Sequence, residues 1–273
     1  MKQIVLLTGS ELRHIFFRKV ISADKNINVL ASYCEGNEES LFERIAINKS
    51  ASKLLIKHEN LRSQAENFFF SQTCNSTEDF SNLIQIKKGD VNNKIVFEEI
   101  IKLNPDLIVS YGSSIINKTL IDKFSGKFIN IHLGLSPYYR GSGTNVWPLI
   151  NKEPEYVGTT FMHIDSGIDT GKIIHQIRAD IESGDDPHSI GCKLIIKTCE
   201  VCKELISQFD RLESHQSRSI KNGRLYLRRD FDNKACKALY LAFSNNIVED
   251  YIKTMSKRKE KAPIFHNNRI SIG

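Results

Sequence analysis

Two stretches of the chain carry polar side chains of the types that move an acyl group. Asn130 and His132 lie two residues apart in FINIHLGLSPYYRG, and Asp169 lies in the later stretch HIDSGIDTGK. Alternate residues of a strand share one face, so the amide and the imidazole can point into one pocket, which the carboxylate of a neighbouring loop can also reach. An amide, an imidazole and a carboxylate that converge in this way predict acyl-transfer chemistry.

The segments around these residues alternate between strands and helices. Periodic apolar runs predict a helix that starts near residue 12 and further helices at 39–70, 96–103, 187–209 and 234–255. Short apolar runs predict strands at 3–8, 27–33, 107–111, 128–133, 156–164 and 172–181. This order predicts an α/β fold with a doubly wound, mostly parallel sheet. Ligands of such sheets bind at the carboxyl ends of the strands, where the polar residues lie.

Composition and charge agree with a soluble enzyme. The 273 residues are 40% hydrophobic, and no stretch approaches the ~18 uninterrupted apolar residues of a membrane helix. The first residues, MKQIVLLTGS, turn polar too soon for a signal peptide, so we expect a cytoplasmic protein with no membrane partner. The net charge of +6 and the basic run at 253–261 suit either nucleic acid or a small anionic substrate, and do not decide the partner.

The six cysteines are scattered through periodic segments, which favours reduced thiols over a disulfide framework. Cys199 and Cys202 have the spacing of half a zinc or redox site. They fall on one face of a predicted helix, however, and no second pair lies at ligand spacing. We therefore expect both to pack in the core, and we expect no metal.

Residues 106–176 carry three motifs, DLIVSYG, FINIHLGLSPYYRG and VGTTFMHIDSGIDTGKIIHQ. Together they resemble the 10-formyltetrahydrofolate-dependent formyltransferases, which act on glycinamide ribonucleotide, methionyl-tRNA or nucleotide-linked amino sugars. The resemblance extends from Met1 to about Phe209 and stops there. It implies a Rossmann-type core in which Asn130 stabilises an oxyanion, His132 transfers a proton and Asp169 orients the imidazole.

The resemblance also implies the cosubstrate 10-formyltetrahydrofolate and the residues that hold it. Glycines in these segments let the backbone approach a flat pterin ring, and apolar side chains contact the ring. The implied folate-binding residues are Tyr111, Gly112, Ser113 and Ile115 after one strand, and Asp165, Gly167, Ile168 and Gly171 in the later loop.

The turn after the first strand is a candidate for the acceptor site. Gly9 permits a sharp turn, Ser10 can cap the next helix, and the free N–H groups of that helix favour an anion. Glycinamide ribonucleotide enzymes hold the substrate phosphate here in a glycine-rich loop, whereas this chain has a single glycine followed by ELRH. A plain turn with a solvated Arg13 and a substrate-binding turn both remain open. The acceptor candidates are Gly9, Ser10, Arg13, His14, Ser136 and Arg140.

The segment after the core predicts a small appendage. A KNG turn at 221–223 predicts a hairpin between 217–220 and 224–227, ahead of the last helix. We therefore predict a catalytic domain at 1–209 and an appendage at 210–273. This appendage is short for the β-barrel of methionyl-tRNA formyltransferases, and its hairpin and helices are similar to those of amino-sugar enzymes.

The sequence thus predicts formyl transfer from 10-formyltetrahydrofolate to a primary amine of a small acceptor, with a nucleotide-linked amino sugar ranked first. Glycinamide ribonucleotide and methionyl-tRNA are the alternative acceptors, and hydrolysis of the formylfolate is a related alternative. From another class, the chain could be a noncatalytic folate- or nucleotide-binding module. We do not expect a nucleic acid partner, and the sequence leaves a homodimer open.

Overall fold

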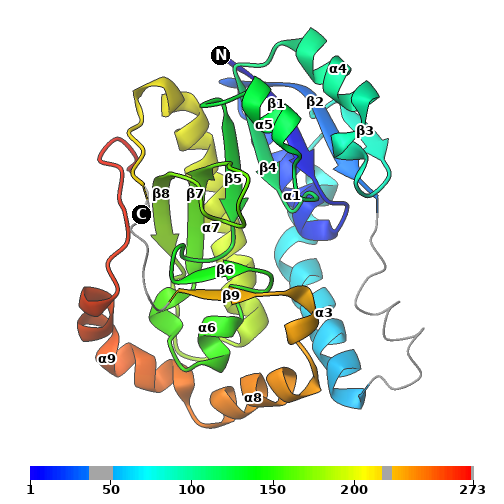
Figure 1. Cartoon of the computed structure of the whole chain (residues 1–273). Helices are drawn as coiled ribbons and strands as arrows, with labels where there is room; N and C mark the ends of the chain where they lie inside the picture. The colour runs from blue at the N-terminus through cyan, green and yellow to red at the C-terminus, as the bar shows by residue number, and fades with distance from the viewer. Residues whose placement is uncertain (37–51, 217–222, 272–273) are drawn as a thin grey trace.

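A central sheet organises the protein (Figure 1). The computed structural model describes residues 1–36, 52–216 and 223–271. Within these residues, seven strands form the sheet in the order β3-β2-β1-β4-β5-β7-β8. The strands are β1 (Lys2–Thr8), β2 (Ile27–Glu35), β3 (Leu83–Ile86), β4 (Leu107–Tyr111), β5 (Phe128–His132), β7 (Gly158–His163) and β8 (Ile173–Arg178). The first five strands in that order pair in parallel, whereas β7 is antiparallel to β5 and β8 is antiparallel to β7. This arrangement confirms the predicted α/β fold with a mostly parallel sheet.

Helices cover both faces of this sheet. Alternate residues of β1 separate the two cores: Ile4 and Leu6 pack with one layer of helices, and Val5 and Leu7 pack with the other. This two-sided burial explains why β1 and β4 are largely apolar. The first layer holds α1 (Leu12–Ser22), α3 (Lys53–Ser76) and α7 (Pro187–Gln208), and the second holds α4 (Lys94–Leu103) and α5 (Lys118–Lys123).

Several predicted elements differ in detail from the structure. The predicted helix at 39–70 corresponds to α3, and its first part, 39–51, lies outside the described residues. Strand β3 was not predicted, because Leu83, Ile84 and Gln85 are exposed at the sheet edge and give no alternating pattern. The predicted helix at 234–255 is two helices, α8 (Asn233–Ser244) and α9 (Ile247–Lys261), which are separated where Asn246 has a φ of +58°.

A second, two-stranded sheet joins the C-terminal segment to the rest of the chain. Strand β9 (Arg224–Tyr226) pairs in parallel with β6 (Tyr139–Gly141), next to α6 (Trp147–Ile150). The Tyr226 ring stacks on Trp147 with centroids 4.0 Å apart. The described partner of β9 is therefore β6. The other strand of the predicted hairpin, 217–220, lies outside the described residues.

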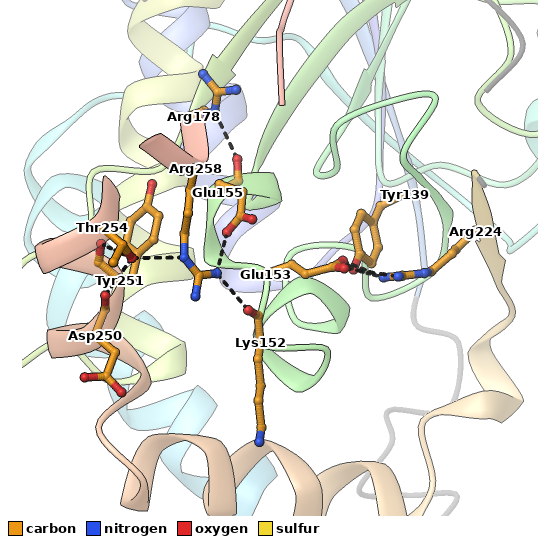
Figure 2. Close-up of polar contacts among 10 residues, drawn as sticks. All are labelled: Tyr139, Lys152, Glu153, Glu155, Arg178, Arg224, Asp250, Tyr251, Thr254 and Arg258. Atoms are coloured by element: carbon orange, nitrogen blue, oxygen red, sulfur yellow. Dashed lines mark hydrogen bonds and ion pairs between the residues drawn. The ribbon is translucent and has the colours of Figure 1, made fainter. Parts of the chain in front are cut away.

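The C-terminal helices pack into the main core. Leu239 of α8 and Val248 and Tyr251 of α9 belong to the same buried cluster as the central sheet. Figure 2 shows Arg258 of α9 donating to the Glu155 carboxylate at 3.1 Å and to the backbone carbonyl of Lys152 at 3.0 Å. The predicted boundary at residue 209 thus separates two segments that share a core.

The six cysteines are all buried and none forms a disulfide. Cys199 and Cys202 pack in the main core, as predicted, and burial raises the pKa of both thiols. None of the described helices is both long enough and apolar enough to cross a membrane.

Candidate active site

The three predicted catalytic side chains meet where β5 ends. Asn130 and His132 come from β5, and Asp169 lies in the loop between β7 and β8. The Asn130 amide donates from Nδ2 to Asp169 Oδ1 at 3.2 Å, and His132 Nδ1 lies 3.3 Å from Asp169 Oδ2. The carboxylate therefore joins the amide and the imidazole, as the family resemblance implies.

The imidazole of His132 is held on both edges. Its Nε2 lies 3.0 Å from the backbone carbonyl of Tyr139, and its Nδ1 faces Asp169. Both ring nitrogens thus face acceptor oxygens, and each contact is a hydrogen bond only when that nitrogen carries a proton. The ring also requires Gly134, because a Cβ there would lie 2.4 Å from His132 Nε2 and 2.6 Å from Thr144 Oγ1.

The loop that carries Asp169 is fixed by contacts of its own. Asp169 has a φ of +51°, a backbone conformation that non-glycine residues adopt only where the surroundings enforce it. Gly141 N–H of β6 donates to Asp169 Oδ2 at 2.8 Å, and Ser136 Oγ donates to the Asp169 carbonyl at 3.1 Å. These bonds hold the carboxylate in place beside His132.

A cavity of about 700 Å³ lies over these residues, at the carboxyl ends of β1, β4 and β5. Its wall includes two exposed apolar side chains, Ile115 at 78% exposure and Ile168 at 40%. Ser136 and Arg140, which were predicted as acceptor residues, are not part of the wall: Ser136 supports the Asp169 loop, and Arg140 lies on β6. The other predicted residues that line the cavity are Gly9, Ser10, Arg13, His14, Tyr111, Gly112, Ser113, Asp165, Gly167 and Gly171.

Glycines near this wall make room for a histidine. A Cβ at Gly9 would lie 2.7 Å from the His14 ring, and one at Gly112 would lie 2.3 Å from His14 Nε2. The ring Nδ1 accepts from the Glu11 N–H at 3.2 Å, and Glu11 is the N-cap of α1. The expectation that Ser10 caps this helix is therefore wrong. Burial lowers the pKa of His14 well below its usual value, so the ring accepts in its neutral form.

The first turn of α1 is ion-paired with α3. Arg13 contacts Glu66 at 2.8 Å and also Glu11, so it is not the solvated side chain that one interpretation of the turn expected. Arg62 pairs with Glu59 at 2.9 Å. All five residues line the cavity, where three carboxylates face two guanidinium groups. No local pattern relates the α3 members to this turn, because Glu66 lies 53 residues beyond Arg13.

Two further histidines on the cavity wall were also missed. The rings of His58 on α3 and His188 on α7 lie with their centroids 4.7 Å apart and their planes tilted by 51°, and both contact the Tyr240 hydroxyl of α8. Burial, with the neighbouring ring and Arg62, lowers the pKa of His58 to about 3. Burial also lowers the pKa of His188 to about 4, although Asp186 opposes the shift. Both rings are neutral at physiological pH.

We expect the protein to lose stability as the pH falls below about 6.5. A histidine in the unfolded chain titrates near pH 6.5, whereas His58 and His188 in the fold titrate near 3 and 4. Below pH 6.5 the unfolded chain therefore takes up protons that the folded chain does not. The contribution of the two neutral histidines to the free energy of unfolding is complete above pH 6.5 and is lost toward pH 4. Urea midpoints at about pH 7.5 and about pH 4.5 measure the loss. The double variant His58→Gln/His188→Gln should lose less, and an equal loss would assign the effect to other groups.

Known proteins match this chain in sequence and in fold. The sequence profile of the formyl transferase family matches residues 1–201. The methionyl-tRNA formyltransferase of Finegoldia magna is 29% identical over 128 residues, which are 46% of this chain and 41% of the relative. The methionyl-tRNA formyltransferase of Geobacter metallireducens is 37% identical over 120 residues, which are 43% of this chain and 37% of the relative. The chain thus matches about two fifths of the length of these curated relatives.

Solved structures share the fold across most of the chain. A 4-N formyltransferase from Francisella tularensis has a TM-score of 0.56 at 20% identity, over 88% of this chain and 87% of that one. The phosphoribosylglycinamide formyltransferase of Anaplasma phagocytophilum has a TM-score of 0.55 at 14% identity, over 83% of this chain and 98% of that one. An N-formyltransferase from Helicobacter canadensis, solved with folinic acid and dTDP-3-aminofucose, has a TM-score of 0.54 at 19% identity, over 89% of this chain and 81% of that one. Because the family profile spans well over half of the residues, this chain belongs to the formyl transferase family.

Proposed function

We propose that this protein transfers a formyl group from 10-formyltetrahydrofolate to a primary amine of a small acceptor. The observation that carries the proposal is the contact of Asp169 with both Asn130 and His132 at the wall of a cavity of about 700 Å³. Membership of the formyl transferase family supports the same chemistry. A noncatalytic binding module would not need this set of groups.

The cavity fits a folate. Ile115 and Ile168 expose apolar surface to it, and a flat heterocycle is held by such side chains together with backbone polar groups. The loop at 165–171 has a fixed shape, since Asp165 accepts from the Gly167 N–H at 3.0 Å and from Thr170 Oγ1 at 2.9 Å. When bound there, 10-formyltetrahydrofolate would supply the formyl carbon that the amine attacks.

The catalytic side chains then have distinct tasks. Asn130 uses one amide N–H to contact Asp169, which leaves the second N–H to stabilise the oxyanion that forms when the amine attacks. The proton that the amine loses and the leaving nitrogen gains is held between His132 Nδ1 and the Asp169 carboxylate. Asp169 orients the imidazole through Nδ1 and stabilises its charged form. No covalent bond to the protein is required.

We further propose that the acceptor is a nucleotide-linked amino sugar. The cavity wall around the start of α1 carries three carboxylates, Glu11, Glu59 and Glu66, against two paired guanidinium groups. A substrate phosphate there would meet an excess of negative charge, which disfavours glycinamide ribonucleotide. The C-terminal segment contributes Tyr226 and Phe231 to the cavity wall, so an acceptor there contacts a part of the chain that lies beyond the family match. We propose that residues 1–209 form the catalytic domain and that 210–273 complete its acceptor side.

An amine panel tests this function. The full chain is incubated with 10-formyltetrahydrofolate and each of dTDP-3-aminofucose, other nucleotide-linked amino sugars, glycinamide ribonucleotide and charged initiator tRNA. Mass spectrometry then measures formyl addition. We expect formylation of at least one nucleotide-linked amino sugar and none of methionyl-tRNA. Efficient formylation of the tRNA or of glycinamide ribonucleotide would contradict the proposed acceptor. Release of formate with every amine unchanged would show that the protein hydrolyses the formylfolate and does not transfer the formyl group.

A further inference from the structure

Two histidines that take no part in the proposed chemistry form a wall of the same cavity. His58 Nδ1 lies 3.1 Å and His188 Nε2 lies 3.2 Å from the hydroxyl of Tyr240. The ring of Phe231 packs beside them, with its centroid 5.1 Å from that of His58. Both histidines and Phe231 line the cavity, and only 5% of His58 and 7% of His188 is exposed. Four side chains from distant parts of the sequence therefore build one polar and aromatic corner.

The shared hydroxyl sets complementary tautomers in the two rings. A tyrosine hydroxyl has one proton, so Tyr240 cannot donate to both imidazoles. It uses both its donor and its acceptor capacity when it donates to one ring and accepts from the other. Both rings are neutral, since burial lowers the pKa of His58 to about 3 and that of His188 to about 4. The ring that accepts from the hydroxyl carries its proton on the other nitrogen, and the ring that donates leaves its other nitrogen bare.

The pair therefore has one spare donor and one spare acceptor. Among the described residues, neither spare nitrogen has a hydrogen-bond partner. The charged groups that act on the pair are Arg62 and Asp186, which have opposite signs. A corner with neutral rings and balanced neighbours suits an uncharged ligand group, because a free charge would lose its hydration without gaining a counter-charge.

We propose that His58 and His188 bind an uncharged part of the acceptor that carries a hydrogen-bond donor next to a hydrogen-bond acceptor, with its apolar face against Phe231. This subsite rests on the proposed function, because it assumes an acceptor in the cavity that holds the catalytic residues. Two parts of a nucleotide-linked sugar have this chemistry. One is the imide edge of a pyrimidine base, and the other is a pair of neighbouring sugar hydroxyls.

Calorimetric titration of the full chain with dTDP and with dTDP-3-aminofucose tests the subsite. His58→Leu and His188→Leu should each weaken binding of dTDP-3-aminofucose about tenfold, as expected for the loss of one ligand hydrogen bond. Tyr240→Phe keeps both imidazoles but frees their tautomers, so it should weaken binding by a smaller factor. The Tyr240→Phe variant also provides the test of the subsite if a leucine variant does not fold. His215→Leu is the matched control, because His215 lies outside the cavity and should not affect binding.

A third probe, dTDP methylated on N3, identifies the source of the contact. If the base occupies the corner, methylation weakens binding to the wild-type protein and has little effect on the histidine variants. If the sugar hydroxyls occupy it, dTDP binds wild type and variants alike, and only dTDP-3-aminofucose distinguishes them. Equal affinity of folded variants and wild type for every probe overturns the subsite, as does the failure of every probe to bind the wild type.

The same measurements separate the two proposals. Binding that depends on the histidines, without formyl transfer to any amine, contradicts the proposed function and supports the subsite. Formyl transfer to a nucleotide-linked amino sugar with affinities that the histidine variants leave unchanged contradicts the subsite alone.

Discussion

Formyl transfer by the His132→Ala protein is expected to be roughly 100-fold slower or more than by the wild type. The variant loses the group that holds and moves the proton of the attacking amine, and it leaves Asp169 without its imidazole partner. Asn130→Ala should have an effect of similar size, because it removes the N–H that faces the oxyanion. Steady-state rates with 10-formyltetrahydrofolate and the acceptor from the amine panel measure the loss.

The position of Asp169 provides a second variant for the same experiment. Asp169→Asn barely changes the size of the side chain, but it removes the charge that faces His132 Nδ1 and the Gly141 N–H. Turnover should therefore fall while folate affinity changes little. His266→Ala, at a histidine outside the cavity, controls for the loss of a ring elsewhere. Near-native turnover of a folded His132→Ala protein would remove His132 from the mechanism.

A chain truncated after Phe209 is expected not to fold. The truncation removes Leu239, Ile247, Val248 and Tyr251, which are buried in the main core. Each buried side chain of this size contributes about 1.5–3 kcal/mol, and together they approach the 5–15 kcal/mol that separates a typical folded domain from its unfolded state. Circular dichroism and thermal melting of the truncated chain test this expectation.

A matched pair of substitutions on α8 tests the same burial without truncation. Leu239 is fully buried and Leu241, two residues later, is 57% exposed. Leu239→Ala should cost about 2–5 kcal/mol of unfolding free energy, whereas Leu241→Ala should cost little. A truncated chain that melts cooperatively and transfers formyl groups would show that residues 1–209 are sufficient alone.

The parts of the fold that could be predicted are those whose signal is local. Strands β1 and β4 are largely apolar because helices cover both faces of the sheet there, and β5 departs from this pattern at Asn130 and His132. The shared face of Asn130 and His132 follows from their spacing on one strand. Asp169 lies 37 residues after His132, and its assignment depended on the family resemblance of its loop.

The rest of the site depends on contacts between distant segments. His58 and Tyr240 are separated by 182 residues, and Arg13 and Glu66 by 53, so no local periodicity relates them. The cap of α1 shows a second limit. Both Ser10 and Glu11 can accept from a helix N-terminus, and the position of the His14 ring selects Glu11. The predicted hairpin identified the strand at 224–226, but strand pairing with β6 requires the tertiary fold.

The short sheet of β6 and β9 links the C-terminal segment to the backbone groups that contact His132 and Asp169. Strand β6 contributes the Tyr139 carbonyl that contacts His132 and the Gly141 N–H that contacts Asp169. Its neighbour β9 comes from the C-terminal segment, and Arg224 of β9 bonds to Glu153 and the Tyr139 hydroxyl (Figure 2). A chimera that takes this segment from another family member would therefore also change the strand that supports β6. Such an exchange keeps the contacts to His132 and Asp169 only where β6 and the new β9 still pair.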